Sequence, residues 1–550
     1  MDEAADLVIR NARVYTLDSE RPWVEAIAVE RDRISYVGSD EGAEHYVGES
    51  TRLIDAEGRL VLPGFIDSHN HIWAGSNPDA VSLFGLESLT ELQETVRAFA
   101  EERPDLEWIL GDGWEYTMFP DGGLPMADDL EGLTGGRPVL FVSYDAHTIW
   151  LNRPAMKRVG ITPETEEVPF GELVLDRQGR PTGILKGTMG LTDEAEESLW
   201  QFVPNRDAED RYASLKQNLS DAVRYGITTI VEPQASVRRL PMYKKALEEG
   251  HLKSRLQIAL YHPPGTTQEE VDRFAGARRN YDDDRIRVSA IKLYIDDVIE
   301  PHTAALLEPY ADLPGERGDM FYAPETFNEV VTRLEAQGFQ LFIHAIGDRG
   351  IRVALDALEH ARRANGPRDS RHQLVHVELL SPEDIPRFKE LDVTACMQPR
   401  HCAPDISGYW AANVGPARSK YAWALRSLSE SGARLAFASD WDVSEMEPLV
   451  GIYTAVTRRG MDNEPLDGWI PEQRVSVETA VEAYTLSGAY ANFLEDNRGS
   501  IEPGKYADLV MLSDNLFEID PGKIKEARVL LTLVGGEEVY SEPSELATHP

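Results

Sequence analysis

Residues 59–71 read RLVLPGFIDSHNH, an apolar run that ends in Asp67, His69 and His71. Seven further apolar runs follow along the chain, separated by stretches of helical character: TTIVEP (228–233), LQIALYH (256–262), RVSAIKLYID (287–296), FQLFIHAIGD (339–348), HQLVHVEL (372–379), VTACMQPRH (393–401) and RLAFASDWD (434–442). Strands that alternate with helices indicate a parallel sheet. Eight such strands are the number that closes a (β/α)8 barrel. The sequence therefore predicts an α/β protein built on a TIM-type barrel.

The two ends of the chain have a different pattern, with short alternating strands separated by Gly, Asp and Asn. Segments such as ADLVIRNARVYTL near the start and GKYADLVMLS near the end share it. We therefore expect residues 1–58 and 496–550 to form one subdomain and residues 59–495 the barrel. Two extra strand-like runs, 107–114 and 138–147, fall between the first and second barrel strands, so residues 76–225 are predicted to be an insertion.

Composition excludes several classes of protein. The chain has 95 acidic and 55 basic residues, a net charge of −40, and a field of that sign repels nucleic acid. No apolar run approaches the ~20 residues of a membrane-spanning helix, and the acidic start does not resemble a signal peptide. We expect a soluble, cytoplasmic protein that binds a small molecule and neither nucleic acid nor membrane. Only 12 of the basic residues are lysine, which favours a halophilic protein over an ordinary acidic enzyme.

The ends of the predicted strands carry side chains that bind metal ions. His69 and His71 are two positions apart on an extended chain, so both imidazoles face the same side. The other strand ends supply further candidate ligands: Lys292, His344, His376 and Asp440. Active sites of such barrels lie at the carboxyl ends of the strands. Five strand ends that each supply a ligand type predict a metal centre.

Each of these residues also has a structural explanation. A single strand histidine is more often a hydrogen-bonded core or surface residue, and Asp440 is a reasonable helix N-cap. Lys292 lies in an apolar strand, where an unpaired ammonium group is costly. Either it pairs with Asp296 or Asp297, or it reacts with CO₂ and becomes an anionic carbamate that bridges two cations.

The motif LPGFIDSHNH resembles the first-strand signature of the amidohydrolase superfamily. Longer motifs are similar to its YtcJ-like branch, which includes N-substituted formamide deformylase: GDGWEYTMFPDGGLPMADDL, RPVLFVSYDAHTIWLN, IKLYIDD, FIHAIGDRG, HVELLSPEDIPRFKELDVTACMQPRH and ASDWDV. The resemblance extends from about residue 5 to residue 540. It implies a barrel, a β-sandwich-like subdomain from both termini, and a homodimer.

After the eighth strand this chain has Asp442 where the family often has proline, so Asp442 is a further candidate contact to metal or substrate.

The resemblance implies six metal ligands: His69, His71, Lys292, His344, His376 and Asp440. His69, His71 and Asp440 would hold one ion and His344 and His376 a second, bridged by carboxylated Lys292; one or two ions are both compatible with the sequence. Nitrogen-rich sites favour zinc, with Mn²⁺ or Fe²⁺ as alternatives. Hydroxide formed at the metal would attack a C–N amide-type bond of an N-acyl or N-formyl amine or a cyclic amide, with Asp440 as the proton carrier.

Other expectations are less direct. His147, His401 and Trp114 are predicted to contact substrate, and Asp67 to orient an imidazole or cap a turn. An esterase, lactonase or deaminase on the same metal centre, and a barrel that acts only as a binding scaffold, are the alternatives to an amidohydrolase. Phosphate-loop, dinucleotide and serine-hydrolase motifs are absent from the sequence.

Overall fold

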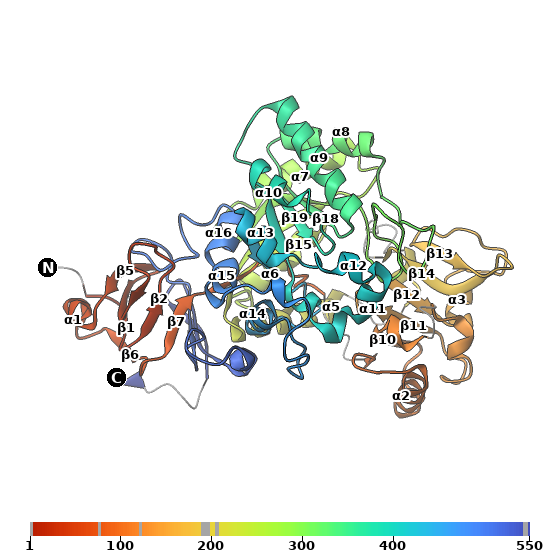
Figure 1. The fold of residues 1–550 in the computed structure, drawn as a ribbon. Coiled ribbons are helices and arrows are strands. Elements are labelled where there is room, and N and C mark those ends of the chain that lie inside the picture. Colours follow the sequence, from red (N-terminus) through yellow and green to blue (C-terminus); the bar gives the residue numbers. More distant parts are fainter. Residues whose placement is uncertain are drawn as a thin grey trace.

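The computed structural model describes residues 4–74, 79–119, 124–188, 198–203, 208–542 and 548–549. Strands from the two termini lie at one end of the molecule, the barrel lies in the middle, and the sheet of the insertion lies at the other end (Figure 1). Within the described residues, no helix has the length and apolar character needed to cross a membrane.

Eight parallel strands form the central sheet, in the order in which they occur in the sequence. They are β8 (Phe65–Asp67), β15 (Ile227–Ala235), β16 (Arg255–Tyr261), β17 (Ile286–Tyr294), β18 (Gln340–Ala345), β19 (Gln373–His376), β20 (Thr394–Met397) and β21 (Leu435–Phe437). Hydrogen bonds from Ser68 N to Phe437 O (3.2 Å) and from Asp440 N to His69 O (2.8 Å) tie the first strand to the segment of the last. Each of the eight strands overlaps one predicted run, with β15, β16 and β17 extending beyond its ends, so the predicted barrel is confirmed.

Helices cover the outside of the barrel (Figure 1). They are α5 (Ala208–Arg224), α6 (Leu240–Glu248), α7 (Gln268–Asn280), α8 (Pro324–Ala336), α9 (Asp348–Asn365), α10 (Ile385–Leu391), α13 (Leu425–Ser431), α14 (Pro448–Thr457), α15 (Val477–Ala483) and α16 (Leu486–Ala491). In α9, Ile351, Leu355 and Leu358 recur at helical spacing and are buried. This apolar stripe holds the helix against the sheet.

Small and apolar side chains fill the inside of the barrel, among them Ala290 of β17 and Phe342 of β18. Successive side chains of a strand point to opposite faces. Lys292 and His344, two positions further along β17 and β18, therefore face the same interior, one layer closer to the carboxyl ends of the strands. The alternation that packs the core thus also aims these two side chains at the site.

The insertion forms a six-stranded sheet of its own. Its strands, in spatial order, are β13 (Glu172–Leu175), β14 (Pro181–Lys186), β12 (Thr148–Leu151), β11 (Val139–Ser143), β10 (Ile109–Trp114) and β9 (Ala80–Ser82), accompanied by α2 (Leu89–Glu102) and α3 (Arg153–Arg158). Helix α5 also falls in the range 76–225, but its buried Leu215 and Leu219 belong to the core of the barrel. Residues 76–78, 120–123, 189–197 and 204–207 of this range lie outside the described residues.

Strands from both termini pair in two further sheets. One contains β25 (Thr548–His549), β6 (Arg52–Asp55), β1 (Leu7–Arg10), β4 (Ala26–Glu30) and β5 (Arg33–Gly38); the other contains β24 (Glu537–Ser541), β23 (Val529–Val534), β22 (Leu509–Leu512), β7 (Leu60–Pro63), β2 (Arg13–Tyr15) and β3 (Trp23–Val24). The single run predicted over 59–71 is therefore two strands, β7 in a terminal sheet and β8 in the barrel. They meet at Gly64, where a Cβ atom would lie 2.7 Å from Thr228 Cβ.

Candidate metal centre

Asp440 lies at the centre of the predicted ligands. Its Oδ1 atom is 3.3 Å from His69 Nε2 and 3.4 Å from His71 Nε2, and its Oδ2 atom is 3.6 Å from His376 Nδ1. Donor atoms of His69, His376 and Asp440 all lie within 4.8 Å of one another, which is close enough for one metal ion. The resemblance had assigned His376 to a second ion, together with His344. In the structure His376 lies with His69 and Asp440, so the expected division of the ligands between two ions is not seen in the geometry.

The remaining candidates lie beside this group. The ring of His344 is 4.5 Å from the ring of His376, centroid to centroid, and stacks on Tyr294 at 4.4 Å. Lys292 Nζ lies 4.8 Å from the centre of the Tyr294 ring and is fully buried. The fold therefore brings all six predicted ligands to one end of the barrel.

The pairing of Lys292 with a neighbouring carboxylate is not observed. Asp296 instead accepts hydrogen bonds from the backbone N–H groups of Ala305, Ile346 and Gly347, at 2.8 to 3.0 Å. Asp297 forms an ion pair with His147. Lys292 Nζ is buried and has no hydrogen-bond partner among the described residues.

Two of the candidate ligands have an unusual backbone conformation. His376 has φ 77° and Asp440 has φ 59°, in the left-handed region that non-glycine residues seldom adopt. Asp67 holds the segment that contains Asp440, because it accepts a hydrogen bond from Ser439 N at 2.9 Å and another from Asn70 Nδ2 at 2.8 Å. Of the two predicted roles for Asp67, these bonds match turn stabilisation.

Burial places several donors in the protonation state that binds metals. It lowers the pKa of His69 to about 3, so the imidazole is neutral. Burial likewise lowers the pKa of Lys292 to about 8. At Asp440 burial opposes ionisation, but the contacts with His69 and His71 outweigh it and hold the carboxyl pKa well below its usual range. Neutral imidazoles and an ionised carboxylate are the forms in which these side chains coordinate a cation.

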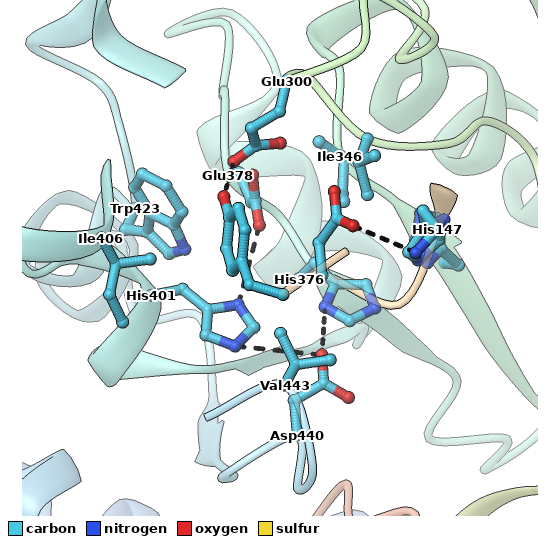
Figure 2. A pocket seen from close by; sticks show the side chains of 14 residues that line it. His147, Glu300, Ile346, His376, Glu378, His401, Ile406, Trp423, Asp440 and Val443 are labelled. Atoms are coloured by element: carbon cyan, nitrogen blue, oxygen red, sulfur yellow. Dashed lines mark hydrogen bonds and ion pairs between the residues drawn. The ribbon is translucent and has the colours of Figure 1, made fainter. Parts of the chain in front are cut away.

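A cavity opens beside these ligands and holds about 430 Å³ of space, part of it open to solvent. Figure 2 shows His376 and Asp440 on its wall, with His147 and His401 nearby. His401 Nε2 lies 4.0 Å from Asp440 Oδ2. His147 comes from the insertion, and its ion pair with Asp297 outweighs burial and raises the imidazole pKa to about 9. The structure thus brings both predicted histidine contacts to the cavity.

Trp114 and Asp442 lie elsewhere. Trp114 is fully buried in the core of the insertion, where its ring packs edge-on against Tyr116, Phe119 and Trp150. It is not among the described residues that line the cavity, and neither is the half-buried Asp442. Large aromatic side chains mostly build cores, which explains the position of Trp114.

Four polar cavity residues were not predicted from the sequence: Tyr144, Asp145, Glu300 and Glu378. Tyr144 and Glu378 belong to motifs already singled out, and Glu378 is only two positions after His376. Their proximity to predicted site residues was a usable signal. Glu300 belongs to the segment between β17 and α8, where no sequence pattern indicated a site.

The sequence profile described as the amidohydrolase family matches residues 52–540. The chain belongs to this family. It is 31% identical to the protein LONG AFTER FAR-RED 3 of Arabidopsis thaliana, over 98% of this chain and 92% of that protein. The predicted likeness to the YtcJ-like branch is also confirmed: the putative amidohydrolase YtcJ of Bacillus subtilis is 28% identical (96% and 98% covered), and N-substituted formamide deformylase of Arthrobacter pascens is 26% identical (98% and 98% covered).

The fold of this amidohydrolase is similar to that of a metal-dependent hydrolase of Pyrococcus furiosus. The TM-score is 0.69 at 26% identity, covering 93% of this chain and 100% of the other. Family membership, this neighbour and the cluster of donors support a metal-dependent hydrolase.

Proposed function

We propose that this amidohydrolase cleaves a C–N amide-type bond, in an N-acyl or N-formyl amine or a cyclic amide. The observation that carries the proposal is the convergence of six potential ligands at one mouth of the barrel, beside a cavity. The bond type is supported by the name of a relative of matching length, N-substituted formamide deformylase.

The donor set fits a divalent cation. Among the described residues, both ring nitrogens of His69, Nδ1 of His71, Nδ1 of His344 and Nζ of Lys292 are buried without a hydrogen-bond partner. Buried polar atoms are normally satisfied, so a cluster of unsatisfied ones indicates a missing ligand. Its richness in nitrogen favours Zn²⁺, and one or two ions are compatible with the six residues. We also propose that Lys292 is carboxylated, because its buried nitrogen would then become part of an anionic ligand.

When bound, a divalent cation lowers the pKa of water to about 7 and polarises a carbonyl oxygen. The carboxylate of Asp440 accepts a proton from the attacking water and delivers it to the leaving nitrogen. His401 Nε2, buried and without a hydrogen-bond partner, donates to the carbonyl oxygen of the substrate. The products are a carboxylic acid and an amine.

A substrate screen tests this proposal. Purified protein loaded with zinc is given matched N-formyl amines, N-acyl amines, cyclic amides, esters, lactones and aminated rings. We expect release of an amine from the open amides or ring opening of the cyclic ones, abolished by a chelator and restored by metal. Asp440→Asn should lower turnover by orders of magnitude with little change in circular dichroism.

Each other outcome contradicts the proposal in its own way. Turnover of esters and lactones alone indicates an esterase or lactonase, and ammonia from the rings alone indicates a deaminase. No turnover, with fewer than about 0.2 metal ions per chain after metal-supplemented expression (roughly a tenth of a load of two ions), indicates a binding scaffold.

A further inference from the structure

Besides Asp440, three buried carboxylates line the cavity next to the predicted metal ligands: Asp145, Glu300 and Glu378. Asp145 accepts hydrogen bonds from the Tyr116 hydroxyl at 3.1 Å and from His147 N at 3.0 Å, within the insertion. Glu300 is 8% exposed and lies in the segment after β17, and Glu378 is 5% exposed and lies just after β19. Figure 2 shows Glu300 on the far side of the cavity from Asp440, with Glu378 between them. The predicted metal centre and mechanism use neither side chain.

Neutral groups donate a hydrogen bond to Glu300 and to Glu378, and His401 Nδ1 also lies 3.9 Å from Glu378 Oε1. Tyr144 donates from its hydroxyl to Glu300 Oε1 at 2.8 Å, and Trp410 donates from Nε1 to Glu378 Oε2 at 2.8 Å. Among the described residues that line the cavity there is no lysine or arginine. Burial, together with the nearby Glu378, raises the pKa of Glu300 to about 8. Ionising Glu300 and Glu378 together is therefore costly unless a cation binds beside them.

The same cavity also contains unsatisfied hydrogen-bond donors. Trp423 is 2% exposed and His401 is 7% exposed, and both line the cavity. Trp423 Nε1 and His401 Nε2 have no hydrogen-bond partner among the described residues. The indole N–H of Trp423 is a donor and requires an acceptor, such as a carbonyl oxygen, and His401 Nε2 donates to the same oxygen when it carries a proton. The cavity therefore presents carboxylates that suit a cation and buried nitrogen atoms that suit an oxygen acceptor.

We propose that Glu300 and Glu378 bind the protonated amine of a basic amide, so that the preferred substrates are mono-acylated diamines and related cationic amides. One molecule of this class presents an ammonium group to the two carboxylates and a carbonyl oxygen to the unsatisfied donors. The rings of Tyr144 and Trp423 in the same wall add the aromatic surface on which ammonium groups bind well. This inference rests on the proposed function, because it names the substrate class of the same site.

A binding experiment tests the carboxylates without catalysis. Calorimetry compares n-butylammonium with the neutral n-butanol on metal-loaded protein. We expect n-butylammonium to bind wild type, and each of the variants Glu300→Gln and Glu378→Gln to bind it at least about tenfold more weakly. The control is Glu308→Gln, which alters a glutamate on the same connecting segment whose side chain is 75% exposed. Equal binding by wild type and both variants, or no binding of n-butylammonium at all, would overturn the inference.

A kinetic experiment then tests specificity. The cationic amide mono-N-acetyl-1,4-diaminobutane and the neutral N-pentylacetamide differ mainly in a terminal ammonium or methyl group. We expect kcat/KM to favour the cationic amide at least about tenfold in wild type and in Glu308→Gln, and the preference to collapse in Glu300→Gln and Glu378→Gln. If one carboxylate variant does not fold, the other and Tyr144→Phe, which removes the hydroxyl that holds Glu300, give the same test.

The two proposals fail in different ways. Hydrolysis of neutral amides at least as fast as cationic ones, without ammonium binding, would overturn the substrate class and leave the amidohydrolase activity intact. Ammonium binding that depends on Glu300 and Glu378, without cleavage of any amide, would support the binding site and contradict the proposed activity.

Discussion

Lys292 is the single side chain on which the proposed carbamate depends. Its strand is apolar, its side chain is fully buried, and its nitrogen has no hydrogen-bond partner among the described residues. A free ammonium group in this position is costly, whereas a carbamate shared with a cation is satisfied. The burial of this nitrogen therefore supports the proposed ligand role.

Replacing this side chain should release the metal. We expect Lys292→Ala to lose most of its bound metal and its turnover, and added short carboxylic acids to restore part of the activity by taking the place of the carbamate. Elemental analysis and assays of the same samples measure both effects, with the exposed Lys389→Ala as the control. Unchanged metal content and turnover in Lys292→Ala would exclude a ligand role.

His372 predicts a dependence of stability on pH. Burial lowers its pKa to about 3, and its Nδ1 accepts a hydrogen bond from Leu341 N at 3.1 Å. The folded state therefore keeps the ring neutral, whereas the unfolded chain binds a proton below a pH of about 6.5. Stability is lost as the pH falls through this window, by about 1.4 kcal/mol per unit.

The variant His372→Asn retains an acceptor but does not titrate. We expect its melting temperature to fall less than that of wild type between pH 7 and pH 5, the two conditions compared. Other ionisable groups contribute equally to both proteins, so the difference isolates this histidine. Equal falls in the two proteins would show that the ring is accessible to protons in the folded state.

At the scale of elements, the junction between β7 and β8 connects two sheets through one residue. Gly64 lies against Thr228, at the start of the neighbouring barrel strand β15, and leaves no room for a side chain. This close approach allows a strand of the terminal sheet to lead directly into β8, the strand that immediately precedes His69 and His71. The packing of the Gly64 backbone against Thr228, and not the hydrophobic periodicity, therefore divides residues 59–71 into two strands.

We expect Gly64→Ala to destabilise the protein by about 1–3 kcal/mol, because the added methyl group forces Thr228 and its strand to shift. Thermal and urea unfolding measure the loss. The control is Gly408→Ala in α11 (Pro404–Val414), where a Cβ meets no atom within 4 Å and alanine is the better helix former. A Gly64→Ala protein as stable as the control would show that the junction adjusts freely.

At the scale of the whole molecule, a buried ion pair joins the barrel to the terminal sheets. Arg255 of β16 contacts Asp508 through two hydrogen bonds, at 2.8 and 3.1 Å, and the two side chains are only 5% and 3% exposed. Asp508 also accepts a hydrogen bond from Gly535 N at 2.7 Å. The pair fixes parts of the chain that are 253 positions apart.

Asp508→Ala should leave the guanidinium of Arg255 buried without its partner, at a cost of about 3–5 kcal/mol. The exposed pair between Arg13 and Glu518 is the matched comparison, and Glu518→Ala should cost no more than about 1 kcal/mol. Unfolding curves of both variants measure the difference. Similar small losses would indicate that water reaches the Arg255 site.

The net charge of −40 gives a prediction for the molecule as a whole. If the protein is adapted to high salt, its melting temperature and activity should rise as KCl increases from about 0.1 M to about 2 M, because screening reduces the repulsion among its acidic groups. A parallel series with sucrose, which is uncharged, is the control: it stabilises proteins because it is excluded from their surface, but it does not screen charges. Unchanged behaviour across the KCl series would leave an ordinary acidic enzyme.

The sequence by itself determined the eight barrel strands, the position of the insertion and six candidate ligands. It did so because hydrophobic periodicity and short motifs such as HNH are local, and because strand ends of a closed parallel barrel must meet at one mouth. Only the tertiary structure decided the rest: that Glu300 and Glu378 line one cavity, that Trp114 packs in the insertion core, and that the first run divides at Gly64. These features depend on which loops and backbones approach each other across the fold, and no local pattern in the chain encodes such contacts.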